Sequence, residues 1–229
     1  MTVLAKICGL TEGGDARTAD ELGAAYLGVV LTPGFGRSVE AEHAARFLAG
    51  THAPKVAVLV DESPAEAARK ATLVGASVVQ LHGEESVTTV ADLRPRGDWR
   101  LWKAVRARSV RDIAEAVGRY GEWVDGVLVE GWREGVAGGG GVALALPPDA
   151  VRAAIPTSLR FILAGGLTPE NVREAVALFQ PDVVDVSSGV GAGPRRKDPD
   201  RVRAFLDEVA AARRPRHQGG AAGSREEVG

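Results

Sequence analysis

The sequence predicts a (β/α)8 barrel, a single-domain α/β fold, on three observations. Short runs rich in Val, Ile and Leu alternate eight times with longer Ala-rich segments, and such alternation requires parallel strands joined by crossover helices. Eight strand–helix units in roughly 200 residues match the size of this barrel. A doubly wound sheet would carry GxGxxG after its first strand, where this chain has Cys-Gly-Leu-Thr.

The strands are predicted where short β-branched apolar runs are bounded by turn residues. In order they cover Val3–Cys8, Tyr26–Leu31, Lys55–Val60, Ser77–Leu81, Trp99–Ala104, Val124–Glu130, Leu159–Leu163 and Val183–Ser187.

Helices are predicted between the strands. Gly23 ends the first helix, Ser63 caps the third ahead of Pro64, and Thr168 caps the seventh. In order the helices cover Asp15–Leu22, Val39–Leu48, Pro64–Val74, Ser86–Leu93, Val110–Val117, Pro148–Ala153, Pro169–Leu178 and Pro199–Ala211. Residues 214–229 lack apolar periodicity, so we expect a disordered tail there and a barrel over residues 1–213.

The composition is that of an ordinary globular protein. The chain has 229 residues, 45% of them hydrophobic, and 28 basic residues against 30 acidic ones. It has no excess of positive charge for binding nucleic acid or an anionic membrane. No apolar run reaches the roughly 18 residues of a membrane helix. A single cysteine excludes an intrachain disulfide. We therefore expect a cytoplasmic protein.

The loops after the seventh and eighth strands predict a phosphate site. The seventh strand ends in Gly165-Gly166, and the eighth ends in Ser187-Ser188-Gly189. Backbone N–H groups and serine hydroxyls can surround an anion, and helix N-termini add partial positive charge. These two loops commonly bind phosphate in this fold. A requirement for tight turns would also explain the glycines.

Cys8 closes the first strand. A lone cysteine is commonly a small buried apolar residue, but catalytic groups lie at the carboxyl ends of barrel strands. The two-residue period of a strand places Lys6 on the same face as Cys8. Asp185, on the neighbouring eighth strand, is the expected partner of Lys6, because a buried charge requires one. A cation beside Cys8 would favour the thiolate.

Three other strand ends carry polar side chains. Gln80 and His82 share one face of the fourth strand and are expected to present an amide and an imidazole to a ligand. Glu130, at the end of the sixth strand, could be a general acid or base, or form a structural ion pair. Arg37, after the second strand, could close over an anionic substrate or remain a solvated charge. We expect no metal site, because no second histidine lies at helical spacing from His82.

Four motifs, KICGLT, QLHGEE, LAGGLTPENV and VDVSSGV, resemble in order and spacing the phosphoribosylanthranilate isomerases of tryptophan biosynthesis, from about Lys6 to about Val209. The resemblance implies a (β/α)8 barrel without metal or organic cofactor. It implies an Amadori rearrangement of N-(5-phosphoribosyl)anthranilate to 1-(2-carboxyphenylamino)-1-deoxyribulose 5-phosphate.

The resemblance also implies roles for individual residues. Cys8 would be the general base and Glu130 the general acid. Arg37 would bind the anthranilate carboxylate, and the last two loops would bind the phosphate. Gln80, His82 and Asp185 are expected to contact the substrate. The expected partner is a small phosphorylated molecule, not nucleic acid or membrane, and the sequence leaves monomer and homodimer open.

The chain departs from that family around the acid and the anthranilate end. Glu130 stands where the family has aspartate, PGFGR replaces SPR, and GVAGGGGVALAL follows the sixth strand. Gly191 stands where a glutamate commonly follows SSGV. Because the glutamate arm is longer, we expect a slightly retracted loop after the sixth strand. The alternatives are an isomerase or lyase of another phosphorylated sugar, and a non-catalytic barrel that binds a phosphorylated ligand. Retention of Cys8 and of an acid at position 130 argues against the latter.

Overall fold

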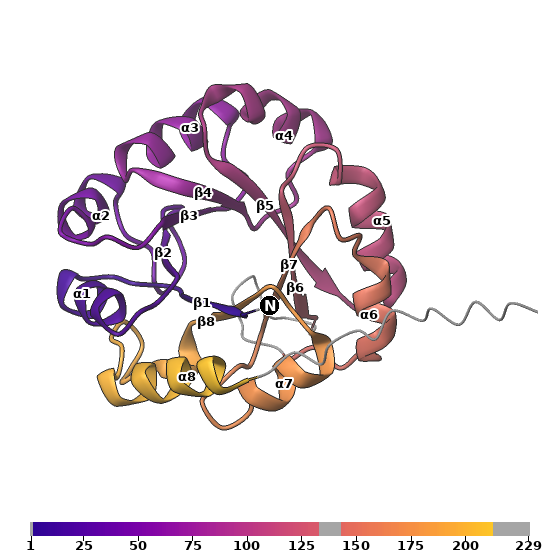
Figure 1. Ribbon diagram of the computed structural model, residues 1–229. Helices are drawn as coiled ribbons and strands as arrows, with labels where there is room; N and C mark the ends of the chain where they lie inside the picture. The colour runs from indigo at the N-terminus through magenta and orange to yellow at the C-terminus, as the bar shows by residue number, and fades with distance from the viewer. Residues whose placement is uncertain (1, 133–142, 213–229) are drawn as a thin grey trace, which may run out of the picture.

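The computed structural model describes residues 2–132 and 143–212. In this part of the chain eight parallel strands close into a barrel in sequence order, with helices around the outside (Figure 1). The strands are β1 (Leu4–Ile7), β2 (Tyr26–Val30), β3 (Lys55–Leu59), β4 (Ala76–Leu81), β5 (Arg100–Ala107), β6 (Gly126–Gly131), β7 (Arg160–Ala164) and β8 (Val183–Val186). The predicted (β/α)8 barrel is confirmed.

A helix follows each strand. The helices are α1 (Gly13–Glu21), α2 (Ala41–Leu48), α3 (Pro64–Leu73), α4 (Val87–Leu93), α5 (Val110–Tyr120), α6 (Pro148–Ala154), α7 (Val172–Phe179) and α8 (Pro199–Ala211). The Ser63 side chain accepts a hydrogen bond from the backbone N–H of Glu66, and Pro64 is the first residue of α3, as predicted. Gly23, just beyond α1, has a φ of 91°, which only glycine adopts without strain.

The start of the seventh helix differs from the prediction. The helix begins at Val172 instead of Pro169, and Thr168 does not cap it. The amide side chain of Asn171 accepts a hydrogen bond from the Thr168 N–H and donates one to the Gly166 carbonyl. These bonds hold a separate turn ahead of the helix, which sequence pattern alone does not distinguish from a first helical turn.

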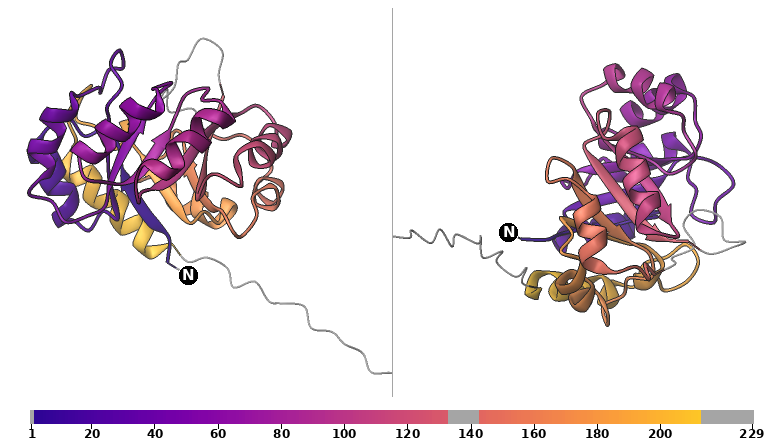
Figure 2. Two further views of the ribbon diagram at one scale, coloured as in Figure 1. Left: turned by 90° about the horizontal axis from the view of Figure 1, so that it is seen from above. Right: turned by 90° about the vertical axis from the view of Figure 1, so that its right-hand side faces the viewer.

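Apolar side chains pack in two layers. The larger layer fills the space between strands and helices, and the smaller one fills the barrel interior. In the interior, fully buried Trp102 meets Tyr26 edge-on, with the ring centroids 5.1 Å apart. Polar side chains that also face inward, Lys6, Gln80 and Asp185, lie nearer the carboxyl ends of their strands. Figure 2 shows the barrel from the side, with the N-terminus at one end of the molecule.

Gly28 provides space inside the barrel for two of the predicted site residues. A methyl group at this position of β2 would lie 2.9 Å from Sγ of Cys8 and 2.9 Å from Cε of Lys6. Contacts this short do not occur between real side chains, so any larger residue would displace one of them. The absence of a side chain at Gly28 therefore lets Lys6 of neighbouring β1, and Cys8 just after it, point inward.

Two predictions concern residues outside the described ranges. The tail expected at residues 214–229 is one of them, and the retraction expected in the loop after β6, which runs into residues 133–142, is the other. Among the residues that are described, no helix has the length and apolar character needed to cross a membrane.

Candidate active site

A cavity of about 370 Å³ lies at the carboxyl ends of the strands. Its volume suits a small molecule. Apolar side chains, including Val30, Phe35 and Val58, form part of its wall. The remainder includes every residue that the sequence analysis assigned to a site: Cys8, Arg37, Gln80, His82, Glu130, Gly165, Gly166, Asp185, Ser187, Ser188 and Gly189.

Lys6 and Asp185 form a buried ion pair on neighbouring strands. They face each other in the β1–β8 register, and Nζ of Lys6 lies 2.9 Å from Oδ2 of Asp185. Burial lowers the pKa of Lys6, but the charges of Asp185 and Cys8 and their hydrogen bonds to Lys6 together outweigh it, so the net shift is upward. The pairing predicted from strand periodicity is confirmed.

Cys8 is 8% exposed and lines the cavity. Burial raises the pKa of its thiol, and the negative charge of Asp185 raises it further. Lys6 and Lys197 lower this pKa without offsetting the increase. Lys6 therefore acts on the Cys8 pKa in the expected direction, but burial and Asp185 outweigh it and the net shift is upward. The carboxylate that pairs with Lys6 also repels a thiolate.

Sequence reasoning missed Lys197, whose side chain lies beside Cys8. Its Nζ donates hydrogen bonds to the backbone carbonyls of Cys8, at 2.6 Å, and of Ser187, at 2.9 Å. Lys197 therefore connects the end of β1 to the end of β8. Burial lowers its pKa to about 8. It lies in PRRKDP among other basic residues, so neither spacing nor composition distinguishes it from solvated charges.

A chain of hydrogen bonds crosses the mouth of the barrel from Asp185 to Glu130. Nζ of Lys6 donates to Oε1 of Gln80 at 3.0 Å. Nε2 of Gln80 lies 2.8 Å from Nδ1 of His82. Nε2 of His82 lies 3.3 Å from Oε1 of Glu130, whose side chain is 7% exposed. Gln80 and His82 do share a face, as predicted, and both contact protein groups there.

Asp185 and Arg37 are available to a ligand. Oδ1 of Asp185 is buried and has no hydrogen-bond partner among the described residues, so a ligand donor would satisfy it. Arg37 lies against Gly9, where a methyl group would approach its Cδ to 2.5 Å. Arg195 holds the same loop by donating a hydrogen bond to the Gly36 carbonyl at 3.0 Å.

The glycine- and serine-containing loops after β7 and β8 pack closely against each other. Gly165 and Gly166 have φ values of 91° and 62°, which favour glycine. A methyl group at Gly189 would lie 1.9 Å from the backbone oxygen of Leu167. Tight backbone packing therefore explains part of the requirement for glycine, and the same loops line the cavity.

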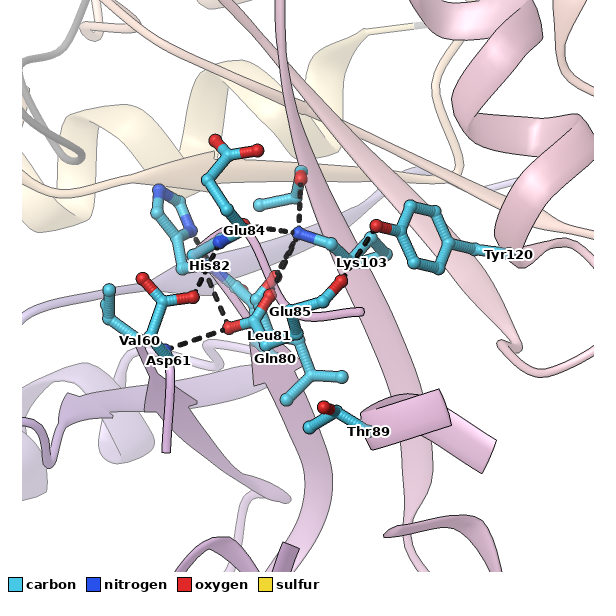
Figure 3. Close-up of polar contacts among 12 residues, drawn as sticks. Val60, Asp61, Gln80, Leu81, His82, Glu84, Glu85, Thr89, Lys103 and Tyr120 are labelled. Atoms are coloured by element: carbon cyan, nitrogen blue, oxygen red, sulfur yellow. Dashed lines mark hydrogen bonds and ion pairs between the residues drawn. The ribbon is translucent and has the colours of Figure 1, made fainter. Parts of the chain in front are cut away.

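A second buried ion pair lies behind the β4–α4 loop, which carries His82 (Figure 3). Lys103 points outward from β5, and its Nζ lies 3.0 Å from Oε2 of Glu85 and 2.7 Å from the Gly83 carbonyl, to which it donates. Oε1 of Glu85 accepts hydrogen bonds from the backbone N–H groups of Gly83 and Asp61. These bonds hold the loop from both sides and thereby position His82.

Close approach of Asp61 explains the glycine in QLHGEE. A methyl group at Gly83 would lie 2.4 Å from Oδ1 of Asp61, and that oxygen accepts a hydrogen bond from the Glu84 N–H at 2.7 Å. Within this motif, Gln80 and His82 face the cavity, whereas Gly83 and Glu85 hold the loop.

Lys103→Met should destabilise the protein by about 3–5 kcal/mol, because it leaves the Glu85 carboxylate buried without its counter-ion. Urea unfolding followed by circular dichroism measures this. The double variant Lys103→Met/Glu85→Gln should recover much of the loss. Arg111→Met, which breaks an exposed ion pair with Glu115, is the control and should leave the unfolding midpoint unchanged. Wild-type stability of Lys103→Met would show that the buried pair does not hold the loop.

Sequence comparisons identify relatives over nearly the whole chain. The family PRAI, N-(5'phosphoribosyl)anthranilate (PRA) isomerase, matches residues 5–208. The N-(5'-phosphoribosyl)anthranilate isomerase of Chromohalobacter salexigens is 40% identical over 214 residues, which cover 92% of this chain and 95% of that protein. The N-(5'-phosphoribosyl)anthranilate isomerase of Paracoccus denitrificans is 38% identical over 216 residues, which cover 92% of this chain and 99% of that protein.

Solved structures agree with this assignment. Phosphoribosyl anthranilate isomerase from Thermotoga maritima matches with a TM-score of 0.82 at 32% identity, covering 92% of this chain and 100% of that chain. A phosphoribosyl anthranilate isomerase in complex with reduced 1-(o-carboxyphenylamino)-1-deoxyribulose 5-phosphate matches with a TM-score of 0.78 at 31% identity, with the same coverage. The chain therefore belongs to the N-(5'-phosphoribosyl)anthranilate isomerase family and is an isomerase of the intramolecular oxidoreductase class.

Proposed function

We propose that this chain catalyses the Amadori rearrangement of N-(5-phosphoribosyl)anthranilate to 1-(2-carboxyphenylamino)-1-deoxyribulose 5-phosphate in tryptophan biosynthesis. The residues that line one cavity support this proposal most strongly. Cys8, just after β1, and Glu130 of β6 both line it, and so do two loops that contain glycine and serine. The rearrangement needs a proton donor, a proton acceptor and a place for the phosphate, and these groups can supply them.

In the proposed mechanism, Glu130 is the general acid. It gives a proton to the furanose ring oxygen, the bond between that oxygen and C1 breaks, and the amine lone pair forms an iminium with C1. Cys8, the general base, then removes the proton from C2. The released electron pair forms the C1–C2 double bond and neutralises the iminium, giving an enolamine. Loss of the C2 hydroxyl proton and protonation of C1 complete the ketone, so atoms and charge balance.

The raised pKa of Cys8 is compatible with this role. It reduces the thiolate fraction near neutral pH but makes each thiolate a stronger base. Lys6 and Lys197 act on the pKa of Cys8 in the opposite direction, so they stabilise the thiolate once it forms. In the proposed complex, a hydrogen-bond donor of the substrate contacts Oδ1 of Asp185, which is buried without a partner among the described residues. The anthranilate carboxylate of the substrate binds Arg37.

Inorganic sulfate should compete with the substrate. We infer that the substrate phosphate binds the backbone N–H groups around Gly166, Ser188 and Gly189. Steady-state inhibition by sulfate measures this, and a crystal grown with sulfate should show the ion there. Gly189→Ala, whose methyl group would collide with the Leu167 backbone, should weaken inhibition on the order of tenfold, which corresponds to one lost charge-assisted hydrogen bond. Equal inhibition of both proteins would contradict this site.

Turnover of N-(5-phosphoribosyl)anthranilate, followed by loss of its fluorescence, tests the proposed function. Expression of the chain should also restore growth of a tryptophan auxotroph that lacks this isomerase, and Cys8→Ser/Glu130→Gln is the matched inactive control. A wild-type protein that binds sulfate but neither turns over this substrate nor complements would favour an isomerase or lyase of another phosphorylated sugar, or a non-catalytic barrel.

We expect the enzyme to act in the cytoplasm as a monomer or homodimer. The solved relatives include monomers derived from the dimeric phosphoribosylanthranilate isomerase of Thermotoga maritima. Sedimentation equilibrium of the full chain would distinguish the two states.

A further inference from the structure

The orientation of the Gln80 amide follows from its contact with Lys6. A lysine ammonium has three donors and no acceptor, so the Gln80 atom 3.0 Å from it must be the carbonyl oxygen. Geometry of the side chain alone rarely distinguishes the oxygen from the nitrogen of an amide. Here the neighbouring charge does so, because the reversed amide would place an NH2 group against the buried ammonium.

The amide orientation in turn determines the tautomer of His82. With its oxygen on Lys6, Gln80 presents its NH2 group to Nδ1 of His82 at 2.8 Å. An amide NH2 donates and does not accept, so Nδ1 must be the unprotonated ring nitrogen. The single ring proton then lies on Nε2, which is 3.3 Å from Oε1 of Glu130 and donates to it.

We propose that Gln80 is a positioning residue, which fixes His82 in the Nε2–H tautomer and thereby orients the Glu130 carboxyl group. Since Oε1 of Glu130 accepts the hydrogen bond from His82, the proton that Glu130 gives to the substrate resides on Oε2. The Gln80 oxygen is engaged by Lys6 and one N–H by His82, so the substrate contact expected of Gln80 would use its second N–H. The catalytic part of this proposal rests on the role of Glu130 proposed above, whereas the tautomer does not.

The tautomer can be measured directly in the full chain. Long-range ¹⁵N–¹H spectra of the labelled protein at about pH 8, where a free imidazole is neutral, separate protonated from unprotonated ring nitrogens. The chain has four histidines, and His82→Gln identifies the signal of His82. We expect an unprotonated Nδ1 and a protonated Nε2. A proton on Nδ1 in the wild type, or an even mixture of tautomers, would overturn the proposal.

Gln80→Glu is the informative variant. Its carboxylate presents an acceptor to Nδ1, so the ring proton should move to Nδ1 and the hydrogen bond to Glu130 should be lost. We expect kcat to fall on the order of 10–100-fold, as for other partners that orient a functional side chain through a hydrogen bond, with KM within about threefold. Gln180→Glu is the matched control: it makes the same substitution just before β8, at the opposite end of the barrel. It should alter neither the His82 spectrum nor kcat.

Gln80→Met provides a second variant in case the new carboxylate disturbs folding. It removes the donor to Nδ1 without adding a charge, so the His82 tautomers should become mixed and kcat should fall less than in Gln80→Glu. An unchanged tautomer in folded Gln80→Met, or a changed tautomer with wild-type kcat, would overturn the positioning role. Absence of turnover in the wild type would instead refute the proposed function, while the spectra would still report the tautomer.

Discussion

Glu130→Gln should abolish ring opening while substrate binding persists. Glutamine has nearly the shape of the carboxylic acid, so the contacts that hold the substrate should remain. Its amide cannot release a proton at comparable cost, so kcat should fall on the order of 10²–10⁴-fold, the usual range for a general acid. Stopped-flow loss of substrate fluorescence gives kcat, and equilibrium titration with a reduced product analogue gives the dissociation constant.

Glu130→Asp tests whether the reach of the acid matters. The family resemblance places an aspartate here, but the cavity of this chain is built around the longer side chain, whose Oε1 meets His82 at 3.3 Å. Withdrawing the carboxyl group by one methylene, ~1 Å, should lower kcat on the order of 100-fold. Wild-type turnover of Glu130→Gln would show that another group is the acid, and Asp185 would be the next candidate.

Cys8→Ser should lower turnover by at least about 100-fold with the fold intact, consistent with the loss of a general base. A serine hydroxyl occupies nearly the same space but is far harder to deprotonate than a thiol, so it cannot accept the C2 proton. Circular dichroism and sulfate affinity serve as controls, since neither depends on the thiolate. Near-normal kinetics in this variant would remove Cys8 from the mechanism and leave it as a packing residue.

The pH dependence of the wild-type enzyme provides a check on the same residue. A thiol of ordinary pKa titrates near 8.5, and burial together with Asp185 raises the pKa of Cys8. Because the deprotonated form is the base, kcat/KM should still be rising with pH above about 8.5. This rise should be absent from the residual activity of Cys8→Ser.

The barrel was predictable because its signals are local. Each strand is a short apolar run and each helix has its own start, so errors are confined to boundaries such as the turn at Asn171 that delays α7. That the candidate residues line one cavity was predictable for a topological reason: all strands are parallel, so their carboxyl ends meet at one mouth. The same reasoning placed Lys6 opposite Asp185, which are partners in the β1–β8 register.

Contacts between segments that are not neighbours in the barrel, and pKa shifts that depend on a balance of competing charges, were not predictable. Lys197 reaches the Cys8 carbonyl from the loop before α8, and no local pattern encodes that contact. The contact between His82 and Glu130 joins strands that are not neighbours. The direction of the Cys8 pKa shift depends on burial and Asp185 outweighing two lysines, a balance that strand periodicity cannot supply.

The burial and the raised pKa of Cys8 have a consequence for how the protein withstands oxidants. Peroxides and alkylating reagents react with thiolates, not thiols. Reactive cysteines that serve as redox sensors have a low pKa and are exposed, whereas Cys8 is 8% exposed and its pKa is raised. Burial and the charge of Asp185, which raise the pKa of Cys8, therefore also reduce the thiolate fraction that an oxidant could convert to sulfenic acid between turnovers.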